Sequence, residues 1–165
     1  MKKNRRKEEV SLIKYRETII DDLDLIVKLR IDFILDINPG IEPQLIEEVR
    51  RITKEYFSDL ISTNQYIGFI GFIDKKPICC AGLLIYKLPP LLQSIKRTQG
   101  HVLNFFTYPE YRNKGYGKGL MNFIIEKARE RQINRLYLNA TKTGEPLYRK
   151  FDFSEPGDKA MVLNI

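Results

Sequence analysis

The chain of 165 residues has no tryptophan, one histidine, two cysteines and three methionines. One histidine and two cysteines cannot assemble a common zinc site, so no metal is expected. The cysteines, Cys79 and Cys80, are neighbours in an apolar stretch. Neighbouring residues of a strand point to opposite faces, which argues against a disulfide between them and fits a reducing compartment.

Long apolar runs are also lacking. No stretch approaches the roughly 20 residues that a membrane-spanning helix needs. The N-terminus carries Lys2, Lys3, Arg5, Arg6 and Lys7 where a secretion signal would have an apolar core. We therefore expect a cytoplasmic protein with no membrane partner.

Basic charge is in large excess only at the N-terminus. The formal net charge is +7, and residues 1–9 contain five of the 28 basic residues and two of the 21 acidic ones, which leaves 23 basic against 19 acidic residues in the rest of the chain. We expect residues 1–9 to form a basic, flexible tail and residues 10–165 a single domain. No nucleic-acid partner is expected, because no recognition motif accompanies the charge.

Glycine is concentrated at one place. Gly115, Gly117 and Gly119 lie between an apolar strand candidate and an amphipathic helix candidate, among the basic residues Arg112, Lys114 and Lys118. The first N–H groups of a helix have no partner within it, and a backbone without Cβ atoms lets a ligand come close. This arrangement predicts a phosphate-binding helix start, although the glycines could instead only cap and pack the helix.

Two common phosphate motifs do not fit the loop. A nucleoside-triphosphate loop needs Ser or Thr after Gly-Lys, and here Gly117-Lys118 is followed by Gly119. A dinucleotide site needs an acidic residue that closes the next strand, and the candidate strand Arg135–Ala140 contains none. The pattern that remains is Arg112-x-x-Gly115-x-Gly117.

This pattern resembles the Arg/Gln-x-x-Gly-x-Gly/Ala signature of the GCN5-related N-acetyltransferases (GNAT), which use acetyl-CoA. Leu138–Thr141, Gly144 and Leu147–Phe153 follow at the spacing of that family. The resemblance covers roughly residues 10 to 165. It implies an α/β fold with a mixed, largely antiparallel central sheet of about six or seven strands and helices on both faces.

Periodicity and breaker residues place the elements. We expect six strands at about Val10–Arg16, Tyr66–Ile73, Pro77–Tyr86, His101–Thr107, Arg135–Ala140 and Ala160–Ile165. Helices are expected from Asp21 or Asp22 to before Asn38, from near Pro43 to Leu60, from Tyr116 to about Arg131, and from Gly144 to Lys150. The inward positions of the first helix are Leu23, Ile26, Val27, Arg30, Phe33, Ile34 and Ile37.

The resemblance also implies the cofactor site. The backbone of one strand end would pair with the pantetheine arm of acetyl-CoA, and the glycine loop would hold its pyrophosphate. Thr141 stands where the commonest form of the family has asparagine. The implied cofactor-binding residues are Phe105, Phe106, Thr107, Arg112, Asn113, Lys114, Gly115, Tyr116, Gly117, Lys118, Thr141 and Tyr148.

Two catalytic candidates follow from the same comparison. Tyr148 matches the tyrosine that protonates the departing thiolate, with a packing role in the core as the alternative. His101 lies eleven residues before Arg112, where several members carry the base for the amine proton. A histidine without catalytic role and a water molecule as base stay open. Cys79 and Cys80 lie among apolar residues, so direct transfer in a ternary complex is favoured over an acyl-enzyme.

The acceptor is not identified by the sequence. A primary amine of a small molecule or peptide is implied, and Asp32, Asp36, Glu42 and Glu47 are candidates to attract it, or simply belong to solvated helix faces. A non-catalytic acyl-CoA-binding or regulatory module is the alternative function. Dimers are common in the family, so a homodimer is left open.

Overall fold

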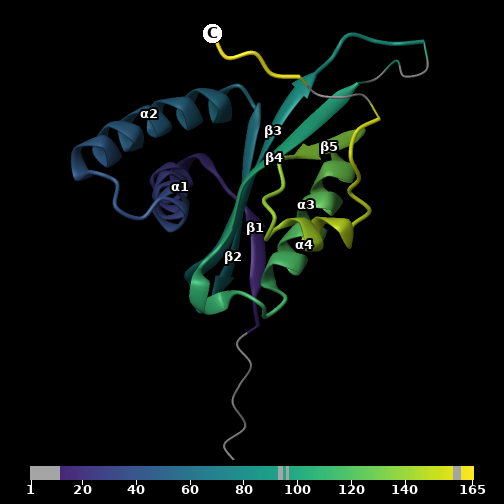
Figure 1. Ribbon diagram of the computed structural model, residues 1–165. Coiled ribbons are helices and arrows are strands. Elements are labelled where there is room, and N and C mark those ends of the chain that lie inside the picture. Colours follow the sequence, from purple (N-terminus) through teal and green to yellow (C-terminus); the bar gives the residue numbers. More distant parts are fainter. Residues whose placement is uncertain (1–11, 93–94, 96, 158–160) are drawn as a thin grey trace, which may run out of the picture.

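The computed structural model describes residues 12–92, 95, 97–157 and 161–165. Figure 1 shows a sheet with helices on both sides. The elements follow one another as β1 (Lys14–Glu17), η1 (Ile20–Asp22), α1 (Leu23–Ile37), α2 (Pro43–Ser62), β2 (Tyr66–Ile73), β3 (Lys76–Lys87), β4 (Thr98–Thr107), η2 (Pro109–Tyr111), α3 (Tyr116–Glu130), β5 (Arg135–Leu138) and α4 (Glu145–Arg149).

The five strands of the described chain lie in the order β1-β2-β3-β4-β5. Strands β1 to β4 pair antiparallel, and β5 pairs parallel to β4. The β2–β3 hairpin turns through Asp74 and Lys75, which both have positive φ (47° and 65°). Two such residues form the tight turn whose twist matches that of the strands. The expected mixed, largely antiparallel sheet is therefore confirmed.

Helices cover both faces of the sheet, as expected. α1 and α2 lie on one side, and α3 and α4 on the other (Figure 1). The core on the α3 side joins helix residues such as Leu120 and Ile124 to strand residues such as Phe69 and Leu83, all fully buried. On the other side, Phe57 of α2 packs on Tyr66 of β2 with ring centroids 4.5 Å apart. The sheet thus separates the hydrophobic core on the α3 side from the one on the α1–α2 side.

The helix boundaries follow local signals. α2 begins at Pro43, where proline loses no hydrogen bond, and α1 ends before Asn38 and Pro39. Asp22 precedes α1 as expected, but its side chain makes no cap bond. It instead accepts hydrogen bonds from the Arg16 guanidinium at 2.6 Å and from the Ile19 N–H at 2.8 Å.

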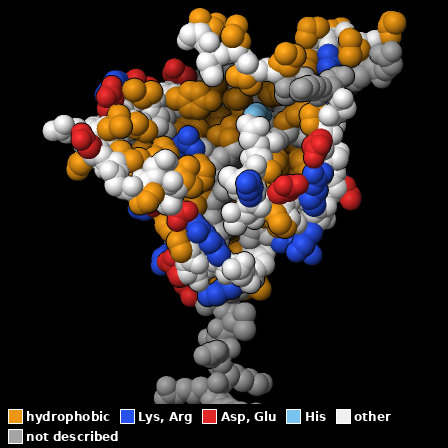
Figure 2. All heavy atoms as spheres, in the orientation of Figure 1, with side chains coloured by type: hydrophobic (Ala, Val, Ile, Leu, Met, Phe, Trp, Pro, Cys, Tyr) orange, Lys and Arg blue, Asp and Glu red, His pale blue; other side chains and the backbone are white. Residues whose placement is uncertain are grey.

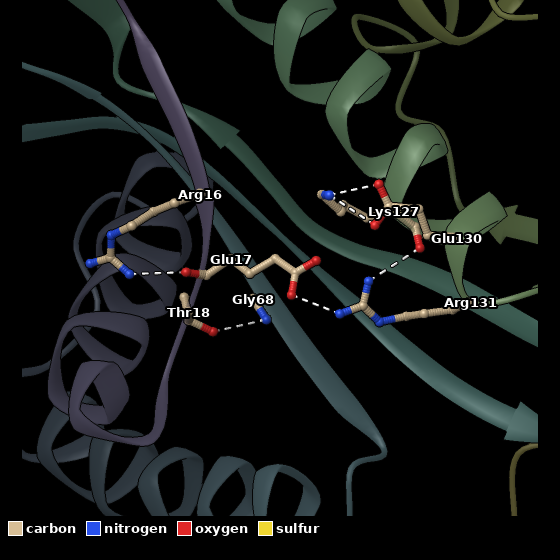
Figure 3. A network of polar contacts seen from close by, with 7 residues as sticks. All are labelled: Arg16, Glu17, Thr18, Gly68, Lys127, Glu130 and Arg131. Atoms are coloured by element: carbon tan, nitrogen blue, oxygen red, sulfur yellow. Dashed lines mark hydrogen bonds and ion pairs between the residues drawn. The ribbon is translucent and has the colours of Figure 1, made fainter.

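Strand β1 is anchored to α3 at one corner of the sheet. The Arg131 guanidinium, just after α3, pairs with the Glu17 carboxylate at 2.7 Å, and the Gly68 N–H donates to the Thr18 hydroxyl at 3.1 Å (Figure 3). At the other end of α3, the Tyr15 hydroxyl donates to the Tyr116 carbonyl at 2.9 Å. The contacts of Arg131 and Tyr15 hold the helix against the sheet and so position the glycine loop before it.

The expectation of six or seven strands is wrong for the described chain, which has five. Residues 161–165 form no strand, and the side chains of Met161, Val162 and Leu163 are more than 80% exposed. Apolar, β-branched residues favour a strand only where a neighbouring strand pairs with them, and here none does. β1 begins at Lys14 rather than near Val10, and β4 begins three residues earlier than expected, at Thr98. The basic tail, residues 1–9, lies outside the described residues.

Candidate active site

Strand β4 extends beyond its partner β5. The pairing between them ends at Val102 and Leu138, whereas β4 continues to Thr107. Its last residues therefore have an edge that no strand of the described residues covers. Backbone N–H and C=O groups on such an edge are available to a ligand that lies alongside like another strand.

A bulge bends β4 where the two strands separate. Gly82 of β3 pairs with Leu103 and Cys80 pairs with Phe106, so Asn104 and Phe105 together oppose a single residue of β3. Asn104 has φ of 55°, in the left-handed region. Bulges redirect the side chains around them and are common next to active sites.

The glycine loop joins β4 to α3. No acceptor is present for the backbone N–H groups of residues 113–118 among the described residues, and the first helical bond runs from the Gly119 N–H to the Gly115 carbonyl at 3.0 Å. Gly115 has φ of 84°, a conformation that favours glycine. The space beside its Cα is open, with no atom within 4 Å of a Cβ built there. Consecutive free N–H groups in an open loop suit an anion with several oxygens.

The two further glycines serve different purposes. A Cβ at Gly119 would lie 2.2 Å from the Tyr15 hydroxyl, so glycine is required there for packing. A Cβ at Gly117 would meet Phe105 at 3.4 Å, which is an ordinary contact. Packing therefore does not demand glycine at position 117, and the bare backbone there suits a ligand.

Tyr148 lies beside the uncovered end of β4. Its ring meets the Phe105 ring edge-on at 5.8 Å and the Phe153 ring at 6.0 Å, and only 9% of the residue is exposed. Burial raises the pKa of the Tyr148 phenol above its ordinary value, so it keeps its proton at physiological pH. The Tyr148 hydroxyl makes no hydrogen bond to a described residue. Every fully buried side-chain oxygen of the described residues has a hydrogen-bond partner, so the unbonded Tyr148 hydroxyl must reach the surface.

The comparisons with known proteins agree with this geometry. The model of the acetyltransferase (GNAT) family matches residues 32–153, well over half of the chain. The chain belongs to the GNAT family. No curated protein sequence matches it.

Solved GNAT structures share the fold over nearly their whole length. A predicted acetyltransferase with acetyl-CoA from Clostridium acetobutylicum is 25% identical, with a TM-score of 0.79 over 92% of this chain and 96% of that one. The GCN5-related N-acetyltransferase from Ralstonia eutropha JMP134 is 24% identical, with a TM-score of 0.74 over 92% and 99%. Glucosamine-6-phosphate N-acetyltransferase from Arabidopsis thaliana is 17% identical, with a TM-score of 0.65 over 92% and 98%.

The basic side chains of the glycine loop differ in the groups that they contact. The Arg112 guanidinium donates to the Asp36 carboxylate at 2.5 Å and to the Thr107 carbonyl at 2.9 Å, so it ties the loop to α1 and β4. The Lys114 ammonium lies 5.6 Å from the centre of the Tyr111 ring, and Lys118 is exposed. Arg112 is thus held in place by protein groups, while both lysines can turn toward an anion.

Thr141 has a local role that the sequence did not reveal. Its hydroxyl oxygen accepts from the Gly144 N–H at 3.1 Å, and its carbonyl accepts from the Glu145 N–H at 2.9 Å. It therefore shapes the turn into α4, the helix that carries Tyr148. The hydroxyl proton is still free to donate to a ligand.

His101 lies on the other face of the sheet. Cross-strand pairing places it in one row with Tyr66, Leu84 and Tyr137, and the Tyr66 ring packs against α2. Directly paired residues point to the same face, so His101 faces the α1–α2 side. In Figure 2 the chain's single histidine, in pale blue, borders a hollow lined by hydrophobic side chains. The two catalytic candidates thus flank the sheet, on either side of the gap between β4 and β5.

The acidic candidates for amine attraction are mostly engaged. The Asp32 carboxylate accepts from the Lys28 ammonium at 2.5 Å and from the Tyr108 hydroxyl. Asp36 pairs with Arg112, and Glu47 with Arg50 at 3.3 Å. Glu42 precedes α2 as its N-cap residue, without a side-chain cap bond. Three of the four carboxylates therefore form ion pairs within α1, within α2 or with the glycine loop.

The cysteines are unsuited to carry an acyl group. Both are buried in β3, and burial raises the pKa of the Cys79 thiol to about 12 and that of Cys80 further. A thiol that stays protonated is a poor nucleophile. This agrees with direct transfer to the acceptor.

Sequence reasoning missed one group near the bulge. Arg30 of α1 donates to the Asn104 side-chain oxygen at 2.5 Å, and Asn104 also interacts with the Tyr66 hydroxyl. The available signal was an arginine at an inward position of an otherwise apolar helix pattern. The bulge that brings Asn104 to it has no comparable mark in the sequence.

Proposed function

We propose that the protein is an acetyl-CoA-dependent N-acetyltransferase that transfers the acetyl group directly to a primary amine. One observation carries the proposal: the uncovered end of β4 leads into a glycine loop with free N–H groups and ends beside the open hydroxyl of Tyr148. Acetyl-CoA has a chemical group for each of these three features. Its elongated pantetheine arm suits the strand edge, its pyrophosphate suits the loop N–H groups, and its thioester sulfur suits the Tyr148 hydroxyl. The similar structure of a predicted acetyltransferase with acetyl-CoA from Clostridium acetobutylicum supports this assignment.

The backbone of β4 and the loop would hold the cosubstrate. The Tyr108 N–H donates to the Ile78 carbonyl of β3 at 3.1 Å. Because N–H groups along a strand alternate in direction, Phe106 also faces β3, and Phe105 and Thr107 face the uncovered side. We therefore assign the pantetheine and thioester contacts to the N–H groups of Phe105 and Thr107, and the pyrophosphate to those of residues 113–118.

The chemistry follows from the two faces of the sheet. An amine entering from the α1–α2 side attacks the carbonyl carbon, and the Phe105 N–H stabilises the negative charge that forms on its oxygen. The carbon–sulfur bond then breaks, and Tyr148 donates its proton to the leaving thiolate on the α4 side. The amine proton goes to His101 or to water. His101 lies three residues before Asn104, about 10 Å along the strand, so the proton would reach His101 through a chain of water molecules.

The alternative, a binding module without catalysis, predicts the same cofactor site. The open hydroxyl of the buried Tyr148 favours the enzyme, because packing alone would not require a hydroxyl there. Release of CoA in the presence of an amine separates the two functions.

Thermal denaturation with acetyl-CoA tests the cofactor site. At a hundred times its dissociation constant, the ligand should stabilise the fold by about 2.7 kcal/mol. Gly117→Glu should abolish most of this gain, because it places a carboxylate among the phosphate-binding N–H groups. Asn122→Glu adds the same charge at an exposed position further along α3 and serves as the control. No stabilisation of the wild type at saturating acetyl-CoA would refute the proposal.

A further inference from the structure

Arg30 is a basic side chain on the acceptor side without an acidic partner in the described chain. It projects from α1 toward the sheet, where one guanidinium nitrogen donates to the Asn104 side-chain oxygen at 2.5 Å. Its guanidinium carbon also lies 5.4 Å from the centre of the Phe33 ring. No carboxylate of a described residue lies within ion-pair distance of it.

The acidic residues near Arg30 are already paired with other basic residues. Lys28, on the same helix, pairs with Asp32, and Arg112 pairs with Asp36. Both carboxylates of the inner part of α1 are thus used by other cations. Arg30 keeps its full charge although it is half-buried, and desolvation by burial lowers its pKa. A partly buried cation without a counter-ion is costly, and an anion beside it would offset that cost.

The guanidinium has donors to spare. Arginine has five N–H groups, of which the recorded hydrogen bond uses one. Among the described residues no buried side-chain nitrogen lacks a partner, so the nitrogens of Arg30 that make no bond reach the surface. A planar fork of accessible N–H groups matches the two oxygens of a carboxylate or of a phosphate.

The surroundings place Arg30 in the acceptor site. Arg30 lines a small hollow together with Tyr66, Cys80 and Asn104, between α1 and the sheet. Asn104 is the bulge residue directly before Phe105, whose N–H we assign to the thioester. Tyr66 belongs to the cross-strand row that contains His101. An anion held by Arg30 would therefore lie within a few bonds of the reacting amine.

We propose that Arg30 binds an anionic group of the acceptor, a carboxylate or a phosphate, and that the substrates are amines carrying such a group close to the amino group. This inference rests on the proposed acetyltransferase function. The nearby positive charge has a second effect, because it disfavours the ammonium form of the bound amine and so favours the nucleophile. Arg30 would thus select the acceptor and help to deprotonate it.

Acceptor pairs test the proposal by release of CoA. Each pair differs only in the anionic group: L-phenylalanine and phenethylamine, L-tyrosine and tyramine, and glucosamine 6-phosphate and glucosamine. At least one anionic member should have a kcat/KM about 10- to 100-fold above that of its partner, as expected for a charged hydrogen-bonded pair. The amino acids report on a carboxylate and the sugar phosphate on a phosphate.

Variants assign the preference to Arg30. Arg30→Gln should raise the acceptor KM about 10- to 100-fold, remove the preference within the pair and leave the KM for acetyl-CoA unchanged. Arg30→Lys should keep part of the preference, because it keeps the charge but not the fork. Arg129→Gln makes the same change on the exposed surface of α3, across the sheet, and should alter neither value.

A binding measurement does not depend on turnover or on the choice of amine. Calorimetric titration of the CoA-saturated protein would compare N-acetylphenylalanine with N-acetylphenylalaninamide, and N-acetylglucosamine 6-phosphate with N-acetylglucosamine. Tighter binding of an anionic member, lost in Arg30→Gln, supports the inference. Equal binding or no binding in both pairs overturns it, and so does equal acetylation of charged and uncharged amines. Failure to bind CoA would instead refute the proposed function.

Discussion

Tyr148 combines a buried ring with an accessible hydroxyl. The ring contacts of Phe105 and Phe153 hold it in place, while the hydroxyl bonds to no described residue. A tyrosine that only packed the core would gain nothing from this hydroxyl. Its position at the uncovered end of β4 fits a proton donor for a leaving thiolate.

Tyr148→Phe should lower kcat by about a hundredfold, within the range typical of a lost general acid, without weakening acetyl-CoA binding. The ring contacts persist in the variant, so its melting temperature should be close to that of the wild type. Steady-state kinetics and a thermal shift with acetyl-CoA measure the two effects. Because the pKa of Tyr148 is raised by burial, wild-type kcat should show no loss from its ionisation below about pH 10. An unchanged kcat in the variant would remove Tyr148 from the acid role.

His101 faces the α1–α2 side, from which we propose that the amine enters. His101→Gln should reduce the rate most near neutral pH, and the deficit should shrink toward pH 9, where a larger fraction of the amine is already deprotonated. The pH dependence of kcat/KM for the acceptor measures this change. A profile parallel to that of the wild type would leave the proton transfer to water.

Strand β4 organises the site at the scale of elements. It pairs with β3 along its length but with β5 only as far as Val102. The Phe105 side chain packs in the core on the α3 side, whereas the Asn104 side chain bonds to Arg30 of α1 on the other face. One strand therefore supplies the ring that contacts Tyr148, the amide that bonds to Arg30 and the N–H group that we propose for the thioester. The position of α3 depends on a glycine, because the missing Cβ of Gly119 allows Tyr15 to pack against the start of the helix.

Strand β3 carries two buried thiols that make stability depend on alkaline pH. The folded chain holds Cys79 and Cys80 protonated, whereas the unfolded chain releases these protons above about pH 9. The folded state binds more protons in this range, so stability is complete below pH 9 and falls as the pH rises toward 12. The expected loss is at most about 1.4 kcal/mol per pH unit for each thiol.

Urea unfolding at pH 8, 9 and 10 measures this dependence. The double variant Cys79→Ala/Cys80→Ala should be less stable at pH 8, because it leaves cavities, but should lose less stability between pH 9 and 10. Equal slopes for the two proteins would show that the thiols do not cause the alkaline loss.

At the scale of the whole molecule, the sheet separates two functions. α3 and α4 lie on one side of the sheet and α1 and α2 on the other (Figure 1). Tyr148 packs in the core on the α3 side, whereas His101 and Arg30 face the α1–α2 side. Under the proposed function, a thioester bound on one side would meet an amine from the other at the gap between β4 and β5. No helix of the described residues is long and apolar enough to cross a membrane.

The sequence by itself determined what depends on neighbours along the chain. Conformational preferences over a few residues explain four features: the glycine loop, the α2 start at Pro43, the Asp74-Lys75 turn and the alternation of strands and helices. Spacing over longer stretches identified the GNAT family, which the family match confirms. Asp152, just after α4, has φ of 61°, in the left-handed region that glycine favours.

Only the tertiary structure decided what depends on residues distant in sequence. Residues 161–165 have strand-forming side chains but no partner strand, so the expected last strand is absent. Asp36 meets Arg112, and Arg30 meets Asn104, across more than seventy residues. Whether a charge is neutralised within the protein or left for a ligand depends on such contacts. They arise from the packing of α1 on the bulged strand, which no local pattern encodes.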